Sequence, residues 1–418
     1  MMVKTPIIID TDPGVDDIVA LLFALASPEI EIIAIIVSYG NTDLESCYRN
    51  IFKAYQAVSR EVETHPQAAE RFPNMFSDVK TILARGSDGP LEGDLHGAQY
   101  FHGRDGLSGI HERHPELDVS DMSHPQITVS EEHGVDLALR LVEASKDRSI
   151  TYVVLGPLTN LARMMHKNRD LVTSKLGRVV SMGGALDVPG NTNPVAEFNY
   201  FADPYAVKEL LCPHDPSTGF PLDRFFMVPL DITTPHELPF PAYKAQVDNA
   251  FESAAKPSVA SDKSPLRHFT SSFLERTRMV MLEFGKDAME LHDIVAVWFA
   301  LANTGPLSPG WGVSKRVFDI ERTGELTRGM LVVDRRSDES AYALGANRAE
   351  VQAQLEKATT EHHPHEDFAV QVQVETAADV DKTDAAGVLS VNQTPGPEVL
   401  LQMLLERIWG VGKKIEGK

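Results

Sequence analysis

Four aspartates lie within the segment DTDPGVDD, residues 10–17. A helix start accommodates one or two acidic side chains, because its exposed N–H groups and its dipole favour negative charge. Four crowded carboxylates repel one another, so they either take up protons or require a cation. Carboxylates without a neighbouring cluster of cysteines and histidines are hard oxygen ligands. The segment therefore predicts a site for Ca²⁺ or Mg²⁺ rather than for zinc.

The sequence around this segment predicts a scaffold in which short apolar strands alternate with helices. The expected strands are Ile7–Ile9, Ile32–Val37, Ile150–Leu155, Val179–Ser181 and Phe226–Leu230, and the expected helices are Ile18–Leu25, Ser46–Val58, one that starts at Leu158, and Ala288–Asn303. This pattern is typical of the α/β class, with a mostly parallel central sheet and helices on both of its faces. Polar residues follow directly after these strands, which is where open parallel sheets bind ligands.

The chain is expected to form a single large domain over residues 1–336. Within it, Ser59–Asp78 is polar and holds two prolines, which indicates a surface loop or insertion. Residues 337–367 are rich in Glu and His, so we expect an exposed, partly mobile excursion. Residues 368–418 are expected to return to the domain with a strand at Phe368–Val374 and a terminal helix at Val399–Trp409.

Composition limits the partners of this 418-residue chain. Its formal charge of −21 argues against binding to nucleic acid or to an anionic membrane, since such surfaces select basic proteins. Cys47 and Cys212 are too few for a disulfide framework or a thiolate metal site, which suits a reducing compartment. No charged segment leads into an apolar one at the N-terminus, and no apolar run approaches the ~20 residues of a membrane helix. We therefore expect a soluble cytoplasmic protein.

The aspartate segment resembles the signature of the inosine-uridine preferring nucleoside hydrolase family, and further blocks match that family in order. They are VSYGN at 37–41, HGRDGLSG at 102–109, LGPLTN at 155–160, MGG at 182–184, Asn191 with AEFN at 196–199, His292 with Asp293, and GELTRG at 324–329. The likeness spans about residues 5–335. It implies a calcium-dependent enzyme that uses water to cut the bond between a ribose and its nucleobase, with residues 1–336 as the catalytic domain.

The resemblance implies a calcium site made by the carboxylates of Asp12, Asp17 and Asp293 and by the backbone carbonyl of Leu155. Many relatives have threonine at the last position, but a carbonyl ligand does not depend on the side chain. The ion would also hold two ribose hydroxyls and the attacking water. Asp12 is the expected general base, because it would touch both the ion and a water whose pKa the metal lowers.

The resemblance also implies a set of ribose-binding residues, namely Asp16, Asn41, Asn191, Glu197 and Asn199. His102 would contact the base and Met182 the sugar. Asp16 could instead cap a helix, and Asn41 could simply turn the chain after a strand. Glu197 and Asn199, two residues apart, would project to the same side of an extended segment.

Cleavage of an N-ribosidic bond builds positive charge on the sugar and negative charge on the departing base. Carboxylates and amides stabilise the first, whereas the second needs a proton donor. His292, the neighbour of the metal ligand Asp293, is the expected general acid. Trp298, Trp311 and Trp409 lie elsewhere, so the tryptophan stack of purine-selective relatives is not expected and inosine or uridine is favoured.

Two other functions compete with this interpretation. A haloacid dehalogenase-like phosphatase also places Asp-x-Asp after its first strand with Mg²⁺ beside it, and there Asp10 would be the nucleophile. That alternative leaves Glu197, Asn199 and Asp293 unexplained. A non-catalytic ribonucleoside-binding protein would keep the sugar site, although both Asp12 and His292 are present. Because members of the family commonly form dimers or tetramers, we also expect a homo-oligomer.

Overall fold

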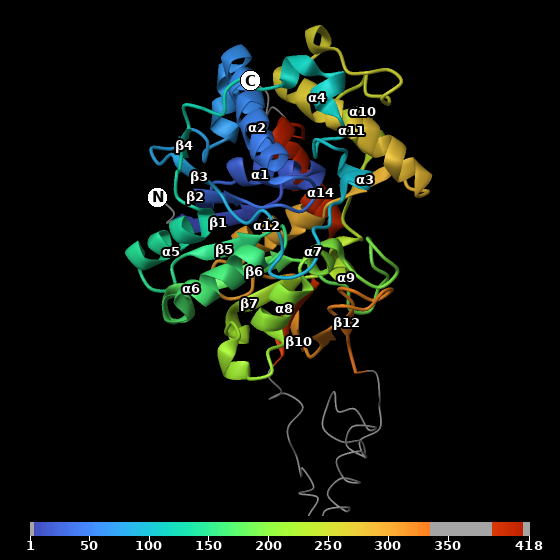
Figure 1. The fold of residues 1–418 in the computed structure, drawn as a ribbon. Coiled ribbons are helices and arrows are strands. Elements are labelled where there is room, and N and C mark those ends of the chain that lie inside the picture. Colours follow the sequence, from blue (N-terminus) through green and yellow to red (C-terminus); the bar gives the residue numbers. More distant parts are fainter. Residues whose placement is uncertain (1–3, 335–386, 413–418) are drawn as a thin grey trace, which may run out of the picture.

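The computed structural model describes residues 4–334 and 387–412, and in this part of the chain one nine-stranded sheet forms the centre (Figure 1). The strand order is β10 (Gly312–Arg316), β13 (Val388–Gln393), β7 (Phe225–Val228), β6 (Arg178–Met182), β5 (Thr151–Val154), β1 (Thr5–Thr11), β2 (Ile30–Val37), β3 (Thr81–Arg85) and β4 (Ile127–Val129). All neighbouring pairs are parallel except β10 with β13. The predicted α/β class with a mostly parallel sheet is confirmed.

The side chains of the central strands alternate between two apolar cores, one on each face of the sheet. In β1, Ile7 and Ile9 belong to one core and Ile8 to the other. Successive side chains of a strand point to opposite faces, so a strand that is covered on both faces must be apolar at every position. This explains the continuous apolar runs that the sequence shows in place of an alternating pattern.

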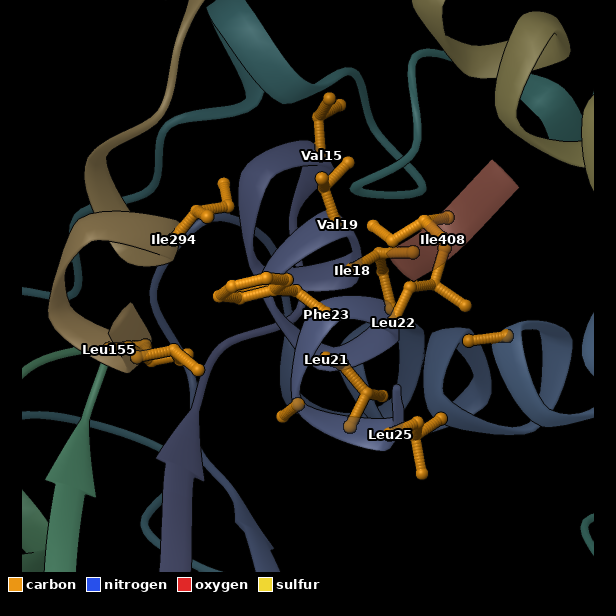
Figure 2. Packing of buried hydrophobic residues seen from close by; sticks show 14 of the residues in the cluster. Val15, Ile18, Val19, Leu21, Leu22, Phe23, Leu25, Leu155, Ile294 and Ile408 are labelled. Atoms are coloured by element: carbon orange, nitrogen blue, oxygen red, sulfur yellow. The ribbon is translucent and has the colours of Figure 1, made fainter. Parts of the chain in front are cut away.

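Helices cover both faces of the sheet (Figure 1). The core of one face includes residues from α1 (Val15–Leu25), α2 (Leu44–Thr64), α11 (Pro265–Glu283), α12 (His292–Ala302) and α14 (Pro397–Trp409), and that of the other includes α5 (Gly134–Ala144), α6 (Thr159–Lys175) and α8 (Pro204–Leu211). Figure 2 shows α1 within the first core, with Ile18 and Leu22 beside Ile408 of α14, and with Phe23 on the side of Ile294. The helix that follows the aspartate segment is therefore held on several sides.

Short elements connect these layers. They are α3 (Gln99–His102), α4 (Ile110–Arg113), α7 (Phe198–Ala202), α9 (Leu230–Thr233), α10 (Phe240–Gln246), the pair β8 (Glu237–Pro239) and β9 (Ala288–Glu290), and the pair β11 (Asp319–Ile320) and β12 (Leu331–Val332). None of the helices within residues 4–334 and 387–412 has the length and hydropathy of a membrane span.

Several local expectations were wrong. Helix α2 continues to Thr64, and Ala68, Phe72 and Met75 are buried, so the expected surface insertion at 59–78 begins within a helix and places several side chains in the core. Its apolar residues fall on a helix end and on irregular turns, where no single period makes them visible in the sequence.

The expected helix Ala288–Asn303 starts only at His292, because residues 288–290 pair with β8 as strand β9. Leu230 belongs to α9 rather than to β7. The expected strand Phe368–Val374 and the excursion at 337–367 lie outside the described residues. The chain does return to the sheet through β13, and the terminal helix is confirmed as α14.

We predict that the buried face of α14 stabilises the fold. Leu404 is fully buried on this helix, whereas Glu398 is exposed on it. Leu404→Ala should lower the free energy of unfolding by ~2 to 5 kcal/mol, since it removes apolar contacts and leaves a cavity. Glu398→Ala should change it by less than ~0.5 kcal/mol. Urea denaturation measures both variants, and a Leu404→Ala protein as stable as the parent would contradict the packing described.

Candidate active site

The candidate site lies at the carboxyl ends of the central parallel strands. The aspartate segment connects β1 to α1, Asn41 follows β2, Leu155 follows β5 and Met182 ends β6. Because these strands are parallel neighbours, their carboxyl ends meet at one edge of the sheet. Residues that are more than 150 positions apart in the sequence are thereby brought into one place.

Three carboxylates converge at this edge. Asp16, Asp17 and Asp293 each offer an oxygen within 4.8 Å of the others. Asp17 and Asp293 are buried, and Asp16 is partly so. Asp293 is in the first turn of α12, so its position depends on the packing of α12 against α1. The converging set contains Asp16, which the sequence analysis expected to bind ribose, and not Asp12, which it expected to bind the metal.

Asp17 is fixed by hydrogen bonds from four groups. Its Oδ1 accepts from Thr11 Oγ1 at 2.5 Å and from the Asp12 backbone N–H at 3.3 Å. Its Oδ2 accepts from the Gly14 N–H at 3.0 Å and from Asn41 Nδ2 at 2.8 Å. The backbone donors come from the turn between β1 and α1, Gly14 being the N-cap of that helix. The carboxylate of Asp17 is therefore held in one orientation.

Asp12 lies in a space that two glycines leave open. A Cβ atom at Gly40 would come within 1.9 Å of Asp12 Oδ2, and one at Gly156 within 2.7 Å of Oδ1. Oδ2 accepts a hydrogen bond from the Asn41 N–H at 2.8 Å, but Oδ1 is buried without any hydrogen-bond partner. A buried carboxylate oxygen without a partner is costly, so this atom is suited to a ligand.

Burial and mutual repulsion disfavour the charged forms of these carboxyls. Burial first, and then the charge of Asp17, raise the pKa of Asp16 to about 7 and that of Asp12 well above its ordinary value. The pKa of Asp293 is raised well above its ordinary value by burial and by the charges of Asp16, Asp17 and Asp12. A dication would compensate these charges, and the all-oxygen set fits a hard ion such as Ca²⁺ or Mg²⁺. The described residues thus contain a candidate metal site where the sequence predicted one.

His292 lies at the first position of α12 with both ring nitrogens engaged. Its Nδ1 is 2.7 Å from Thr233 Oγ1, and its Nε2 is 3.1 Å from Glu290 Oε2. Burial lowers the pKa of His292, but the hydrogen bond and charge of Glu290, with further contributions from Asp16 and Glu197, outweigh it and raise that pKa. The protonated imidazole is therefore favoured at this position.

His102 closes the site from the loop after β3. It is at the end of α3, and its Nδ1 accepts a hydrogen bond from the Val15 N–H at 3.0 Å. Burial lowers its pKa to about 3, and the charge of His292 contributes to this shift. The ring is therefore neutral and carries its proton on Nε2. Gly14 permits this approach, since a Cβ there would lie 2.4 Å from the His102 Nδ1.

The expected extended arrangement of Glu197 and Asn199 is wrong, because Glu197 is the N-cap of helix α7 and Asn199 lies within that helix. The Glu197 carboxylate accepts hydrogen bonds from the N–H groups of Gly184, Asn199 and Tyr200. Asn199 Nδ2 donates to the carbonyl oxygens of Leu155 and Met182 at 2.7 and 3.2 Å. Two polar residues that are two positions apart occur both in strands and at a helix N-terminus, so the sequence spacing of Glu197 and Asn199 did not distinguish these two structures.

These residues surround a cavity of about 530 Å³. The sequence-predicted residues that line it are Asp16, Asn41, His102, Leu155, Met182, Asn191, Glu197, Asn199, His292 and Asp293. Asp12 and Asp17 lie beneath this lining rather than in it. Asn191 Oδ1 accepts a hydrogen bond from the Phe198 N–H at 3.0 Å, which ties the loop before α7 to the cavity wall.

The sequence analysis missed a second group of lining residues. Their side chains are mostly apolar or aromatic, and they include Tyr100, Phe101, Met281, Phe284 and Met289. Glu290 and Lys286 also line the cavity, and Lys286 Nζ lies within hydrogen-bond distance of Glu290 and Glu237. Glu290 stands two residues before His292, a spacing that could have indicated a partner for that histidine. All three tryptophans are described, and none lines this cavity.

Asp10 occupies a different environment from the other aspartates. Its carboxylate is fully buried and accepts hydrogen bonds from Tyr152 Oη at 2.9 Å and Asn160 Nδ2 at 2.8 Å. Burial raises its pKa to about 7 despite these bonds. The phosphatase alternative required Asp10 as an exposed nucleophile, so the geometry argues against it.

We predict that the space around Asp12 is needed for cation binding. Gly156→Ala would place a methyl group 2.7 Å from Asp12 Oδ1, which displaces that carboxylate. Gly89→Ala is the matched control, since a Cβ there meets nothing within 4 Å. Calorimetric titration with Ca²⁺ should show weaker binding for Gly156→Ala and unchanged binding for Gly89→Ala. Equal affinity in all three proteins would mean that Asp12 is not part of the site.

Comparison with known proteins agrees with this geometry. Residues 7–382 match the family described as inosine-uridine preferring nucleoside hydrolase, a longer match than the ordered blocks at 5–335 indicated. An uncharacterised protein of Schizosaccharomyces pombe is 30% identical over 78% of this chain and 88% of its own. The pyrimidine-specific ribonucleoside hydrolase RihA of Klebsiella pneumoniae is 30% identical over 79% of this chain and 88% of its own.

Among solved structures, the purine-preferring ribonucleoside hydrolase from Gardnerella vaginalis has the same fold, with a TM-score of 0.63 and 21% identity over 97% of this chain and 98% of its own. Neither the phosphatase nor the non-catalytic alternative finds support in these comparisons. The chain therefore belongs to the inosine-uridine preferring nucleoside hydrolase family, whose members hydrolyse the N-glycosidic bond of ribonucleosides.

Proposed function

We propose that this enzyme cleaves ribonucleosides in a Ca²⁺-dependent reaction, with Asp12 as general base and His292 as general acid. The observation that carries the proposal is the group of Asp12, Asp16, Asp17 and Asp293, of which Asp16 and Asp293 line the 530 Å³ cavity while Asp12 and Asp17 are buried beneath its lining. The same cavity presents His292, Glu197 and Asn199, which gives one space both an acidic floor and polar walls. Its size suits a small-molecule ligand.

Asp12, Asp17, Asp293 and the Leu155 carbonyl would hold the ion. When bound, Ca²⁺ supplies positive charge that attracts hydroxyl oxygens and lowers the pKa of a water beside it. The converging oxygens of Asp16, Asp17 and Asp293 support a site at this position, and the unpartnered Asp12 Oδ1 supports a fourth acidic contact. Asp16 lines the cavity, so it is also available to a ribose hydroxyl.

Asp12 is suited to accept a proton because only one of its oxygens is engaged by the protein. Asn41 fixes Oδ2 through its backbone N–H, and this leaves Oδ1 for a water. A raised pKa increases the affinity of a carboxylate for a proton, and burial raises that of Asp12. The backbone carbonyl of Asp12 accepts from Asn41 Nδ2 at 3.1 Å, which further restricts this residue.

Asp16, Asn41, Asn191, Glu197 and Asn199 are proposed to bind the ribose. Each lines the cavity, and Glu197 is held by three backbone N–H donors that keep its carboxylate in place. A carboxylate oxygen has two lone pairs, so a held carboxylate still accepts from a hydroxyl. Negative charge beside the sugar would stabilise the positive charge that develops there as the bond breaks.

His292 is proposed to protonate the leaving nucleobase. Glu290 lowers the cost of its charged form, while Thr233 fixes the opposite side of the ring. Because both nitrogens are engaged, proton donation requires that a substrate atom replace one of these partners. His102, neutral and buried beside Val15, is proposed to contact the base rather than to transfer a proton. Met182 is proposed to contact the sugar.

Inosine or uridine is proposed as the substrate class. None of the three tryptophans lines the cavity, which disfavours a tryptophan stack around a purine. The relatives above differ in base preference, since one is named pyrimidine-specific and another purine-preferring. A panel of nucleosides assayed for released reducing sugar tests this proposal, and strict preference for adenosine would contradict it.

A cytoplasmic location and a homo-oligomeric state, dimer or tetramer, are further proposals. The low cysteine content and the acidic charge support the first, and the resemblance to the family supports the second. Light scattering during size-exclusion chromatography measures the mass of the assembly, and a monomeric mass at all concentrations would contradict the proposed oligomer.

We predict that Asp293→Ala nearly abolishes hydrolysis and weakens Ca²⁺ binding. The substitution removes one of the converging carboxylates that would hold the ion. The measurement is calorimetric titration of Ca²⁺ into the variant, with circular dichroism to confirm folding. Asp287→Ala is the control, because that aspartate pairs with Arg278 outside the cavity. Unchanged Ca²⁺ affinity in Asp293→Ala would remove it from the ligand set.

We predict that the effect of His292→Ala depends on the leaving group. General acid catalysis contributes ~10² to 10⁴-fold, so kcat/KM on inosine or uridine should fall by about that factor. A nitrophenyl riboside releases an anion that is stable without a proton, so its loss should be far smaller. The ratio of the two losses is measured at one pH and one Ca²⁺ concentration.

A histidine that only packs against Thr233 and Glu290 would affect both substrates alike. Equal losses would therefore overturn the acid assignment and leave His292 as a residue that orients Asp293. Thr233→Ala serves as the matched variant, since it removes one anchor of the ring but keeps the imidazole. It should retain most of the dependence on the leaving group.

A further inference from the structure

A second cluster of metal-binding side chains lies apart from the acidic site. His114 follows α4, Glu116 lies in the next turn, and His268 comes from α11. One oxygen, Glu116 Oε1, is 3.1 Å from His114 Nδ1 and 2.9 Å from His268 Nε2. One ligand atom from each of the three residues lies within 4.8 Å of the others. Both imidazoles are buried, whereas Glu116 is exposed.

Each of the two imidazoles has a hydrogen-bond acceptor on its far side. His268 Nδ1 is 3.0 Å from Ser258 Oγ, and His114 Nε2 is 3.6 Å from Glu275 Oε2. A histidine that binds a metal through one nitrogen usually donates the N–H of the other to a carboxylate, carbonyl or hydroxyl nearby. Both rings are therefore oriented as metal-bound rings are, with the inner nitrogens converging and the outer ones facing acceptors.

The outer nitrogen of His114 shows what a cation would change in the cluster. If both neutral rings donate to Glu116 Oε1, that nitrogen carries no proton and can only accept. It is buried and has no hydrogen-bond partner, and Glu275, whose Oε2 lies 3.6 Å away, is itself an acceptor. A cation on the inner nitrogens would move the proton of His114 to Nε2, where it faces Glu275, and a second proton on the ring would have the same effect.

We propose that His114, Glu116 and His268 bind a transition-metal dication of the Zn²⁺ class. Zinc takes imidazole nitrogen and carboxylate oxygen at ~2.0 to 2.2 Å in tetrahedral sites, which separates the ligand atoms by roughly 3.4 Å. The inner nitrogens now point at Glu116 Oε1 at 3.1 and 2.9 Å, so an ion would lie near the present place of that oxygen and Glu116 would shift aside to bind it. The exposed Glu116 side chain has room for this movement. Two imidazoles favour Zn²⁺ over Ca²⁺, which prefers oxygen alone.

The surroundings leave room for a fourth ligand. A cavity of about 250 Å³ is lined by Glu116 and His268, and it holds space for a water beside the ion. Lys53 also lines this cavity and is 3.8 Å from Asp118 Oδ1, and Arg113 pairs with Glu275 at 3.0 Å. Arg60 lines the same cavity and donates to the backbone carbonyl of Glu116 at 3.0 Å, while Lys53 and Arg113 face carboxylates.

A metal at this position would join the segment after the HGRDGLSG loop to helix α11. The same two parts of the chain already meet through Ser108 with Thr277, at 3.0 Å between their hydroxyl oxygens, and they both contribute walls to the active-site cavity through His102 and Met281. Because the ion would join these two segments, we propose that it stabilises the folded chain by mass action.

The test is a titration of the full chain with Co²⁺ and Zn²⁺ while Ca²⁺ is kept in large excess. Excess Ca²⁺ occupies the acidic site, and Co²⁺ with imidazole ligands in tetrahedral geometry has a strong visible absorption that Zn²⁺ abolishes. The variants are Glu116→Gln and His268→Gln. His111→Ala is the matched control, because this nearby histidine is exposed and pairs with Asp118 rather than with the cluster.

The expected result is one equivalent of Co²⁺ that Zn²⁺ displaces, with an unfolding temperature that rises as Zn²⁺ is added. Glu116→Gln changes an exposed side chain, so the fold should stay intact. It should weaken Co²⁺ binding at least ~100-fold, because losing a metal ligand costs more than losing a residue that only hydrogen-bonds a ligand. His268→Gln should do the same, and His111→Ala should bind like the parent. If no Co²⁺ binds in the presence of Ca²⁺, or if Glu116→Gln binds Co²⁺ as tightly as the parent, the proposal is overturned. The three side chains would then form only a hydrogen-bonded network.

Discussion

The structure depends on the burial of acidic side chains in one place. Asp12, Asp16, Asp17 and Asp293 crowd together at the carboxyl edge of the sheet, where burial and mutual repulsion raise the pKa of three of them. Such a group costs free energy unless protons or a cation neutralise it. Hydrogen bonds from the start of α1 and from Asn41 hold Asp17, but they leave one oxygen of Asp12 without a partner. The fold thus keeps an electrostatically unfavourable arrangement that a dication would relieve.

The rest of the molecule supplies the rigidity that this arrangement requires. Parallel strands with apolar side chains on both faces place the site residues at one edge, and α1 and α12 pack together so that Asp17 and Asp293 meet. Gly40 and Gly156 let the backbone of neighbouring strands approach the Asp12 carboxylate closely. The same edge carries Glu197 as the N-cap of α7, so a side chain that faces the cavity also begins a helix. The carboxylate of Glu197 therefore serves both the start of α7 and the wall of the cavity.

Much of this could be predicted from the sequence, because the responsible signals are local. The run Ile7-Ile8-Ile9 before the aspartates indicates a strand that is buried on both faces, and three of the four crowded aspartates, Asp12, Asp16 and Asp17, lie at the candidate cation site, whereas Asp10 does not. Other features depend on contacts between distant residues and left no periodic signal. Thr233 meets His292 only because α9 folds beside α12, and Phe72 is buried at the end of irregular turns. The extended arrangement expected for Glu197 and Asn199 failed because a helix cap and a strand share that spacing.

The central claim is that the carboxylates of the ion-free site hold protons which a cation replaces. Calorimetric titration of the parent protein with Ca²⁺ at pH 7, in two buffers that differ in their heat of ionisation, measures this exchange directly. The pKa of Asp16 is raised to about 7, and burial and mutual repulsion raise those of Asp12 and Asp293 well above their ordinary values, so the ion-free site is expected to hold protons more readily than ordinary carboxyls do. Because a cation binds the charged form, the account predicts release of at least ~1 proton per Ca²⁺ bound. Identical binding heats in the two buffers would show that no proton leaves and would contradict it.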